Sequence, residues 1–228
     1  MNPCEYVEKR NFTRFYDRIP QSVEKRTIND HDCSLLMEEL HRSQQKKPEY
    51  IPSYAVELAI YTGMRVGEIA ALRWDHIIYE EGYILIQLSE KYDRKTKTWK
   101  IESTKTGKSR KFPLSNVIVD LLKRIRKAEM KYGFLGEYVF QNQEGRIKAR
   151  AISHCSRYRC KKANIDEKSI HAFRRTLNSK MMVAGVSAVV AASMLGHTEK
   201  VNQLNYTYDI SQMEYKRKII SEINYGSL

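Results

Sequence analysis

The feature that most restricts the fold is one stretch of strand-like sequence, residues 83–114, set between segments with helical patterning. Large apolar and β-branched residues recur or alternate there in three runs, which predict strands: 83–88, 99–104 and 109–114. We expect the four residues 105–108, which include Gly107, to form a hairpin turn between the last two strands. The charged segment 90–98 is expected to connect the first two.

Helical periodicity precedes and follows this stretch. Asn29 or Asp30 can cap a first helix, and a second is expected from about Ser53 to Gly63. Further helices are expected over these approximate ranges: 66–73, 115–130, 150–163, 171–184, 187–194 and 211–223. The sequence therefore predicts an α+β fold, a mostly helical domain with a small antiparallel β-sheet on one side.

The chain is strongly basic, with 40 Lys and Arg against 27 Asp and Glu and a formal net charge of +13. This surplus favours a polyanionic partner, because each neutralised phosphate releases condensed counterions. A merely basic protein is the alternative. No apolar run is long enough to cross a membrane, and the first ten residues are not a secretory signal. We expect a cytoplasmic protein.

The domain boundary is expected near position 25. Residues 1–25 are polar and weakly periodic, which is typical of a linker or the remnant of an upstream domain, and 26–228 are expected to form one domain with a helical tail. The four cysteines have no framework spacing: Cys4, Cys33, Cys155 and Cys160. His154 lies beside two of them, but no second metal-type pair accompanies it, so we expect free thiols and no metal site.

Two segments place an arginine beside a possible proton carrier or carboxylate. On a helix, His171, Arg174 and Asn178 share one stripe, whereas a second stripe is expected to face the core: Phe173, Leu177, Met181 and Ala184. Arg offers a planar fork for phosphate oxygens and His can pass a proton near neutral pH. A solvated polar face is the alternative.

In the second segment, Arg65 follows Gly63 at a helix start, and Glu68 lies on the same side of that helix. Glu68 can hold the guanidinium or a neighbouring imidazole in place. An ordinary capped helix with an intrahelical ion pair explains the same pattern.

Three further features are weak when each is taken alone. Lys105 lies at the expected turn, where a lysine is usually a solvated surface charge. The tripeptide Leu195-Gly196-His197 places a histidine just beyond a glycine that ends an apolar helix. Tyr206 and Tyr208 follow after a short polar segment.

In this order, the features resemble the tyrosine recombinase (phage integrase) family. The first matching box is Thr62-Gly63-Met64-Arg65-x-x-Glu68 with Ala71-Leu72-Arg73-Trp74. Ser103-Thr104-Lys105-Thr106-Gly107 with Arg110-Lys111-Phe112-Pro113-Leu114 resembles the family's β-hairpin lysine. The second box is His171-x-x-Arg174 with Leu195-Gly196-His197 and Tyr206. The resemblance covers residues 26–210.

The resemblance implies that a tyrosine attacks the scissile phosphate and leaves a 3′-phosphotyrosine and a free 5′-hydroxyl, without ATP, metal or other cofactor. Tyr206 lies nine residues after His197, the spacing of the family, so it is the expected nucleophile in preference to Tyr208. Arg65 and Arg174 are expected to bind the non-bridging oxygens. His197 would donate a further hydrogen bond.

The remaining roles implied by the resemblance concern protons and positioning. His171 would act as general base and then acid, and Lys105 as the acid for the leaving 5′-oxygen. Lys100, Lys108 and Lys111 are rivals for that role. Glu68 would orient Arg65 or His171 from behind.

The resemblance also implies partners: double-stranded DNA at a specific recombination site, a homotetramer in the synaptic complex, a monomer in isolation and, in some systems, accessory DNA-bending proteins. Integration or excision of a phage or other mobile element is the expected role. A type IB topoisomerase or telomere resolvase is one alternative, and a DNA-binding module without catalysis is another.

Overall fold

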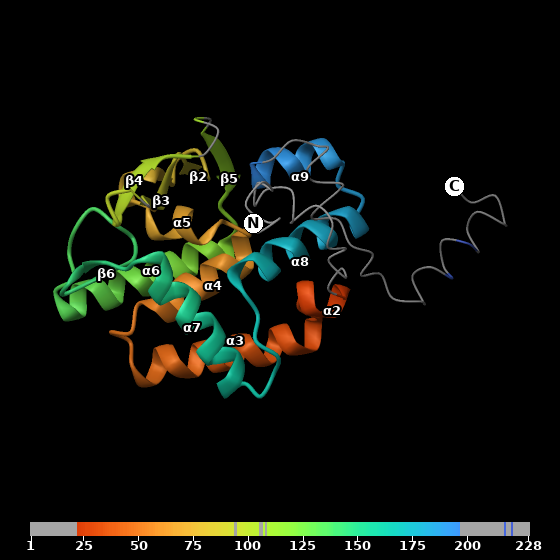
Figure 1. Ribbon diagram of the computed structural model, residues 1–228, viewed down its shortest axis with the longest axis horizontal. Helices are drawn as coiled ribbons and strands as arrows, with labels where there is room; N and C mark the ends of the chain where they lie inside the picture. Colours follow the sequence, from red (N-terminus) through yellow and green to blue (C-terminus); the bar gives the residue numbers. More distant parts are fainter. Residues whose placement is uncertain are drawn as a thin grey trace, which may run out of the picture.

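Helices form the body of the molecule, and short antiparallel strands lie along one side of it (Figure 1). The computed structural model describes residues 22–93, 95–104, 107, 109–196, 217 and 220. The helices are α2 (Val23–Arg26), α3 (Asp30–Lys46), α4 (Pro52–Thr62), α5 (Val66–Ala70), the 3-10 turn η2 (Trp74–His76), α6 (Asn116–Tyr132), α7 (Ala149–Lys162), α8 (Ile170–Val183) and α9 (Ala188–Leu195). The strands are β1 (Ile77–Ile78), β2 (Tyr83–Ile86), β3 (Leu88–Asp93), β4 (Thr98–Ser103), β5 (Arg110–Pro113), β6 (Gln141–Asn142) and β7 (Gly145–Arg146). The predicted α+β architecture is confirmed.

Local signals in the sequence set several helix ends as expected. Asn29 caps α3, because its side-chain oxygen accepts a hydrogen bond from the backbone N–H of Asp32 at 2.7 Å. Gly63 ends α4 with a φ of 59°, a left-handed conformation that a side chain would strain. A Cβ there would also lie 3.3 Å from the Cα of Arg174, so the glycine permits close packing of α4 against α8.

The core is built around α4. This helix is apolar on almost every face, as a helix buried on all sides must be, and it contacts α3, α5, α6, α7 and α8. Val56, Leu58 and Ala59 are fully buried. The helices that carry the candidate site are therefore fixed to one central element.

The strand pairing differs from the prediction. The strands β4 and β5 do not pair with each other: β4 pairs with β3, and β5 pairs with β2. The segment 105–108 is therefore not a hairpin turn between paired strands, and the 90–98 segment is not simply a connection, because it contains most of β3 and the start of β4. The backbone N–H of Thr104 still donates to the carbonyl of Gln87 at 3.1 Å, at the junction of the two sheets.

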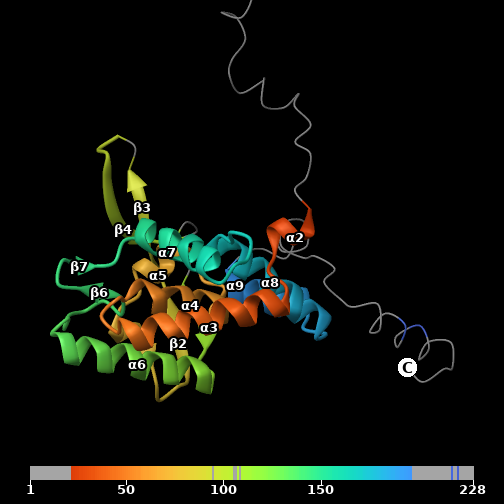
Figure 2. The same ribbon diagram turned by 90° about the horizontal axis from the view of Figure 1, so that it is seen from below.

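Glu90 explains why the sequence of segment 90–98 predicts a connection where the structure has strands. Its carboxylate is buried, lies 2.6 Å from Nη2 of Arg146 and accepts the backbone N–H of Ala149 at 2.7 Å. An inward-facing carboxylate in a strand breaks the apolar pattern on which strand prediction depends. The β3–β4 ribbon projects from the body (Figure 2), and Tyr92 and Trp99 lie opposite each other on it with ring centroids 5.0 Å apart.

The burial of α8 also differs in part. Phe173 is buried as expected, but Ala184 is exposed, and Arg174 and Asn178 of the other stripe are fully buried. The polar stripe is thus an internal surface, because α4 and α9 pack against α8. This excludes the solvated polar face for Arg174 and Asn178.

Some expectations fall largely outside the described residues. Of the helix expected at 211–223, Arg217 and Ile220 are described and are helical, and of the linker 1–25 only residues 22–25 are described. Cys33, Cys155 and Cys160 are free thiols, whereas Cys4 lies outside the described residues. Across the described ranges, no helix has the length and apolar character needed to cross a bilayer, and no His, Cys, Asp and Glu side chains group into a possible metal site.

Glu129 of α6 makes the stability of the fold dependent on pH. Its side chain is buried, and it accepts hydrogen bonds from Nε1 of Trp74 at 3.1 Å and Nη1 of Arg126 at 3.2 Å. Burial raises its pKa to about 7, although both donors oppose the change. Since the folded state holds a proton that the unfolded state releases above its ordinary pKa, stability falls as pH rises from about 4.5 through 7.

We expect Glu129→Gln to match the unaltered chain at pH 5 and to melt about 2–4 °C higher at pH 8.5, a gain on the order of 1 kcal/mol. Thermal denaturation followed by circular dichroism measures this. Glu57→Gln is the matched control: Arg124, Gln44 and His41 overcome the effect of burial and lower the pKa of that carboxyl. The control should destabilise by the same amount at both pH values. An identical melting difference at both pH values for Glu129→Gln would contradict the prediction.

Candidate active site

Arg174 lies at the centre of the candidate site. The side chain is fully buried, which is exceptional for arginine and requires that the guanidinium be hydrogen-bonded. Its Nη1 donates to the carbonyl of Gly63 at 2.9 Å, and its Nη2 donates to the carbonyl of Leu195. Arg174 thereby links α8 to the end of α4 and to the end of α9.

Arg65 is held beside it by the first turn of α5. The backbone N–H of Arg65 donates to Oε2 of Glu68 at 2.8 Å, and Nη1 of the same arginine donates to Oε1 at 2.8 Å. Its Nη2 reaches the carbonyl of Gly196 at 3.2 Å. The side chain is 39% exposed, so a ligand can approach this guanidinium from solvent.

Glu68 binds a second arginine that sequence reasoning assigned no role. Nη1 and Nη2 of Arg110, the first residue of β5, donate to its two carboxylate oxygens at 2.9 and 2.6 Å. Burial alone would raise the pKa of Glu68, but the hydrogen bonds and charge of Arg110 and the charge of Arg65 lower it to about 2. The Glu68 carboxyl group is therefore ionised throughout the physiological pH range, and it binds two arginines.

The carboxyl end of α9 is the meeting point of these groups. The last carbonyls of a helix lack partners within it and carry partial negative charge, so cations are favourable there. Three consecutive carbonyls each accept a hydrogen bond from a different arginine. The carbonyl of Met194 accepts from Nε of Arg110 at 2.9 Å, the carbonyl of Leu195 from Arg174, and the carbonyl of Gly196 from Arg65. Elements far apart in the sequence are thus joined at one helix end.

His171 lies within the influence of this cluster. Burial and the charges of Arg175, Arg174 and Arg65 lower the pKa of its imidazole to about 4. The ring is therefore neutral at pH 7 and has a nitrogen that can accept a proton. An arriving phosphate would raise that pKa by offsetting the nearby positive charge.

The structure brings together four of the seven residues singled out from the sequence: Arg65, Glu68, His171 and Arg174. Lys105, His197 and Tyr206 lie outside the described residues. Arg110 was missed as a functional residue, although one signal was present. Strand alternation places it on the same face as the buried Phe112, so a charge points inward there.

The arrangement is suited to an oxyanion. Arg65 and Arg110 bind the carboxylate of Glu68, and the charges of Arg65, Arg174 and Arg175 act on the neutral imidazole of His171. Backbone carbonyls and Glu68 fix three of these arginines before any ligand arrives, and preorganised cations stabilise negative charge that develops on a bound group.

Comparison with known proteins identifies the family to which the chain belongs. The sequence profile of the Phage integrase family matches residues 26–212, which is most of the chain. The chain belongs to the phage integrase family.

Two curated relatives of this family member are similar to it in sequence and are longer. A "Tyrosine recombinase XerC-like" protein of Caldanaerobacter subterraneus subsp. tengcongensis is 29% identical over 62% of this chain and 41% of its own length. A "Putative integrase/recombinase" of Haemophilus influenzae is 26% identical over 95% of this chain and 52% of its own length. The chain thus spans about half the length of these curated relatives.

Solved structures show the same fold at lower identity. The Tn1549 transposon integrase in complex with a circular intermediate DNA superposes with a TM-score of 0.71 at 18% identity, covering 91% of this chain and 68% of that one. The XerA recombinase superposes with a TM-score of 0.65 at 18% identity, covering 86% and 62%. The family fold is therefore confirmed.

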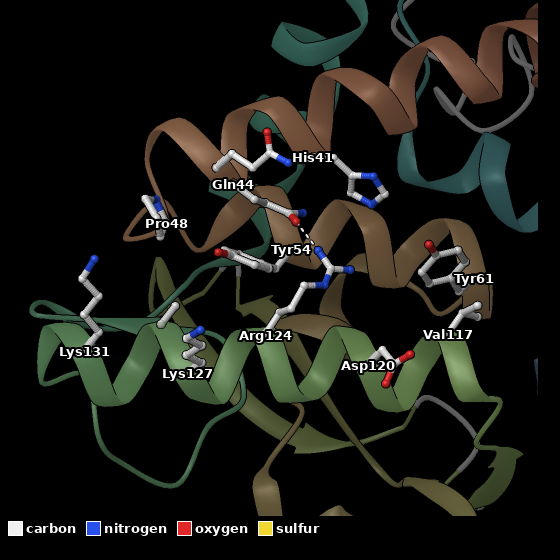
Figure 3. A pocket seen from close by; sticks show the side chains of 12 residues that line it. His41, Gln44, Pro48, Tyr54, Tyr61, Val117, Asp120, Arg124, Lys127 and Lys131 are labelled. Carbon is white, nitrogen blue, oxygen red and sulfur yellow. Dashed lines mark hydrogen bonds between the residues drawn. The ribbon is translucent and has the colours of Figure 1, made fainter.

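A cavity of about 630 Å³ lies elsewhere, between α3, α4 and α6 (Figure 3). In this cavity, Nη1 of Arg124 donates a hydrogen bond to the side-chain oxygen of Gln44 (Figure 3), and Nη2 of Arg124 donates to the buried carboxylate of Glu57 at 2.5 Å. Arg65, Glu68, His171 and Arg174, the described residues among those singled out from the sequence, do not line this cavity. The positive charge of Arg124 is neutralised by Glu57, so we place the candidate site at the arginine cluster and not here.

The depressed pKa of His171 is testable in this member of the integrase family. We expect Arg175→Ala to raise it toward the ordinary value, because Arg175 is the strongest of the three charges that lower it. Titration of the histidine C–H signals by NMR, assigned with a His171→Gln variant, measures both pKa values. Arg175→Lys keeps the charge and should leave the pKa low. A His171 signal that titrates near 6.5 in the unaltered chain would contradict the description of a buried imidazole among cations.

Proposed function

We propose that this chain is the catalytic domain of a site-specific DNA recombinase that cleaves and rejoins strands through a 3′-phosphotyrosine intermediate. The observation that carries the proposal is the convergence of Arg65 and Arg174 on adjacent carbonyls, those of Gly196 and Leu195. His197, the expected third phosphate ligand, is the residue that follows Gly196 in the chain, directly after the two carbonyls that the arginines bind.

The first chemical step is an in-line displacement at phosphorus. The Tyr206 hydroxyl oxygen forms a bond to phosphorus, the bond to the 5′-oxygen breaks, and His171 takes the phenolic proton. Lys105 gives a proton to the departing 5′-oxygen. Arg65, Arg174 and His197 stabilise the extra negative charge of the five-coordinate state.

The second step reverses the first with a different strand. The 5′-hydroxyl of a partner strand attacks the phosphotyrosine and gives its proton to Lys105, which the first step left neutral. The bond between phosphorus and the Tyr206 oxygen breaks, His171 returns its proton to that oxygen, and the phosphodiester is restored. The energy of the broken bond is kept in the protein–DNA bond, so the proposed reaction balances without ATP or a metal.

The two arginines would contribute differently. Arg65 is partly exposed and is the group that a phosphate approaching from solvent meets. Arg174 is buried and would act from beneath, where a low effective dielectric strengthens its charge. Glu68, an anion with a pKa of about 2, would keep Arg65 in place without itself taking part in proton transfer.

Double-stranded DNA at a specific recombination site is the proposed substrate. The net charge of +13 suits a polyanion, and the similar structures include the Tn1549 integrase with circular intermediate DNA, XerH bound to its difH substrate and a lambda integrase dimer bound to a core site. We extend the proposal to a homotetrameric synaptic complex, assembled from monomers and in some systems aided by DNA-bending proteins, that integrates or excises a mobile element inside the cell.

We expect the chain to capture DNA covalently. Sheared and nicked DNA of the replicon that encodes it is incubated with the protein, and adducts are precipitated with dodecyl sulfate and potassium and then sequenced. Recovered ends should share one site. Tyr206→Phe should reduce adducts to background because it lacks the nucleophilic oxygen.

Tyr208→Phe is the matched control and should retain adducts. Adducts formed by Tyr206→Phe would contradict the assigned nucleophile. Adducts absent from the unaltered chain would contradict the proposed function, and relaxation of supercoiled plasmid without a preferred site would favour a topoisomerase instead.

A further inference from the structure

We propose that Arg110 is a positioning residue of the reaction centre, one that holds α5 and the end of α9 in register with the strand that follows Lys105. The inference rests on the proposed function. It concerns a residue that would touch neither the phosphate nor the nucleophile and would act through Glu68 and through the backbone that leads to His197.

All three nitrogens of the Arg110 guanidinium are engaged. Nη1 and Nη2 donate to the two oxygens of Glu68 at 2.9 and 2.6 Å, and Nε donates to the carbonyl of Met194 at 2.9 Å. The side chain is 9% exposed and that of Glu68 is 1% exposed. The fork therefore sets both the distance and the angle between α5 and α9, which a point charge would not do.

The Arg110 guanidinium packs against Gly196 so closely that a side chain at this position would not fit. A Cβ at that position would lie 2.8 Å from Nη1 of Arg110 and 2.9 Å from its Cδ, closer than real Cβ contacts allow. The φ of 72° at Gly196 is also a conformation that favours glycine. Arg110 thus packs directly on the residue that precedes His197.

The effect would pass to Arg65 through Glu68. The same carboxylate that binds Arg110 accepts both the backbone N–H and Nη1 of Arg65. Without the fork, Glu68 would lose two donors and the carbonyl of Met194 one, all within a buried region. A displacement of about 1 Å in groups that bind a transition state can lower a rate about 100-fold.

The competing explanation is that Arg110 only stabilises the fold. The chain provides a matched control in Arg159 of α7, whose Nη1 lies 2.9 Å from Oε1 of Glu39 on α3. The two side chains are 13% and 9% exposed, so this is also a largely buried arginine–carboxylate pair between two elements. Among the described residues, the ion pair of Arg159 is with Glu39 and its ring contacts are with Tyr50 and Tyr158, away from α9.

The experiment compares Arg110→Lys with Arg159→Lys on a nicked suicide duplex built from the site recovered by covalent capture. Melting temperature, duplex affinity and the single-turnover cleavage rate at saturating protein are measured for each variant. We expect similar losses of melting temperature and affinities within about threefold of the unaltered chain. The cleavage rate should fall about 30- to 100-fold for Arg110→Lys only.

Gly196→Ala tests the same contact from the α9 side, and it decides the question if Arg110→Lys does not fold. It should also lower cleavage more than affinity. Equal cleavage by Arg110→Lys and Arg159→Lys, or a loss in Arg110→Lys that lies wholly in affinity, would overturn the inference. If the unaltered chain forms no adduct at all, the proposed function fails first, so the two failures are distinguishable.

Discussion

The organisation of the candidate site depends on one short helix having its negative end satisfied by side chains from other elements. Helix α9 has only eight residues, and its last carbonyls would be costly to bury without donors. Arginines from β5, α8 and the start of α5 supply them. The end of α9 is satisfied in this way only when all three elements are in position, so the packing of these elements and the assembly of the cluster depend on each other.

Concentrating arginines in a buried region requires compensation, and the chain provides it in two forms. Glu68 supplies a full negative charge shared by Arg65 and Arg110, and backbone carbonyls supply partial charges to Arg174. The compensation is incomplete, which leaves a positive field. Together with burial, that field lowers the pKa of His171, and Arg65 is the partly exposed member of the cluster. In the proposed function, the same excess of charge would keep His171 ready to accept a proton and would attract the DNA phosphate.

Much of the fold and of the candidate site could be predicted from the sequence, and the features that could not be predicted share a cause. Caps such as Asn29 and end signals such as Gly63 are local, so helix boundaries followed from the sequence. Pairs of charged side chains that lie far apart in the chain did not follow from the sequence. Glu90 is a carboxylate that the fold buries against Arg146, and Arg110 is an arginine that it buries against Glu68; both look like surface charges until the partner is known. The expected places of Lys105, His197 and Tyr206 stay predictions.

The β3–β4 ribbon has a consequence for how such a domain can vary. Its strands hydrogen-bond with each other, and its far end projects away from the helices (Figure 2). Residues can be added to or removed from its tip in matched pairs without changing the side chains that face α5, since the alternation of a strand repeats every two residues. The length of the ribbon can thus vary at its far end while the pairing at its base and the arginine cluster stay intact.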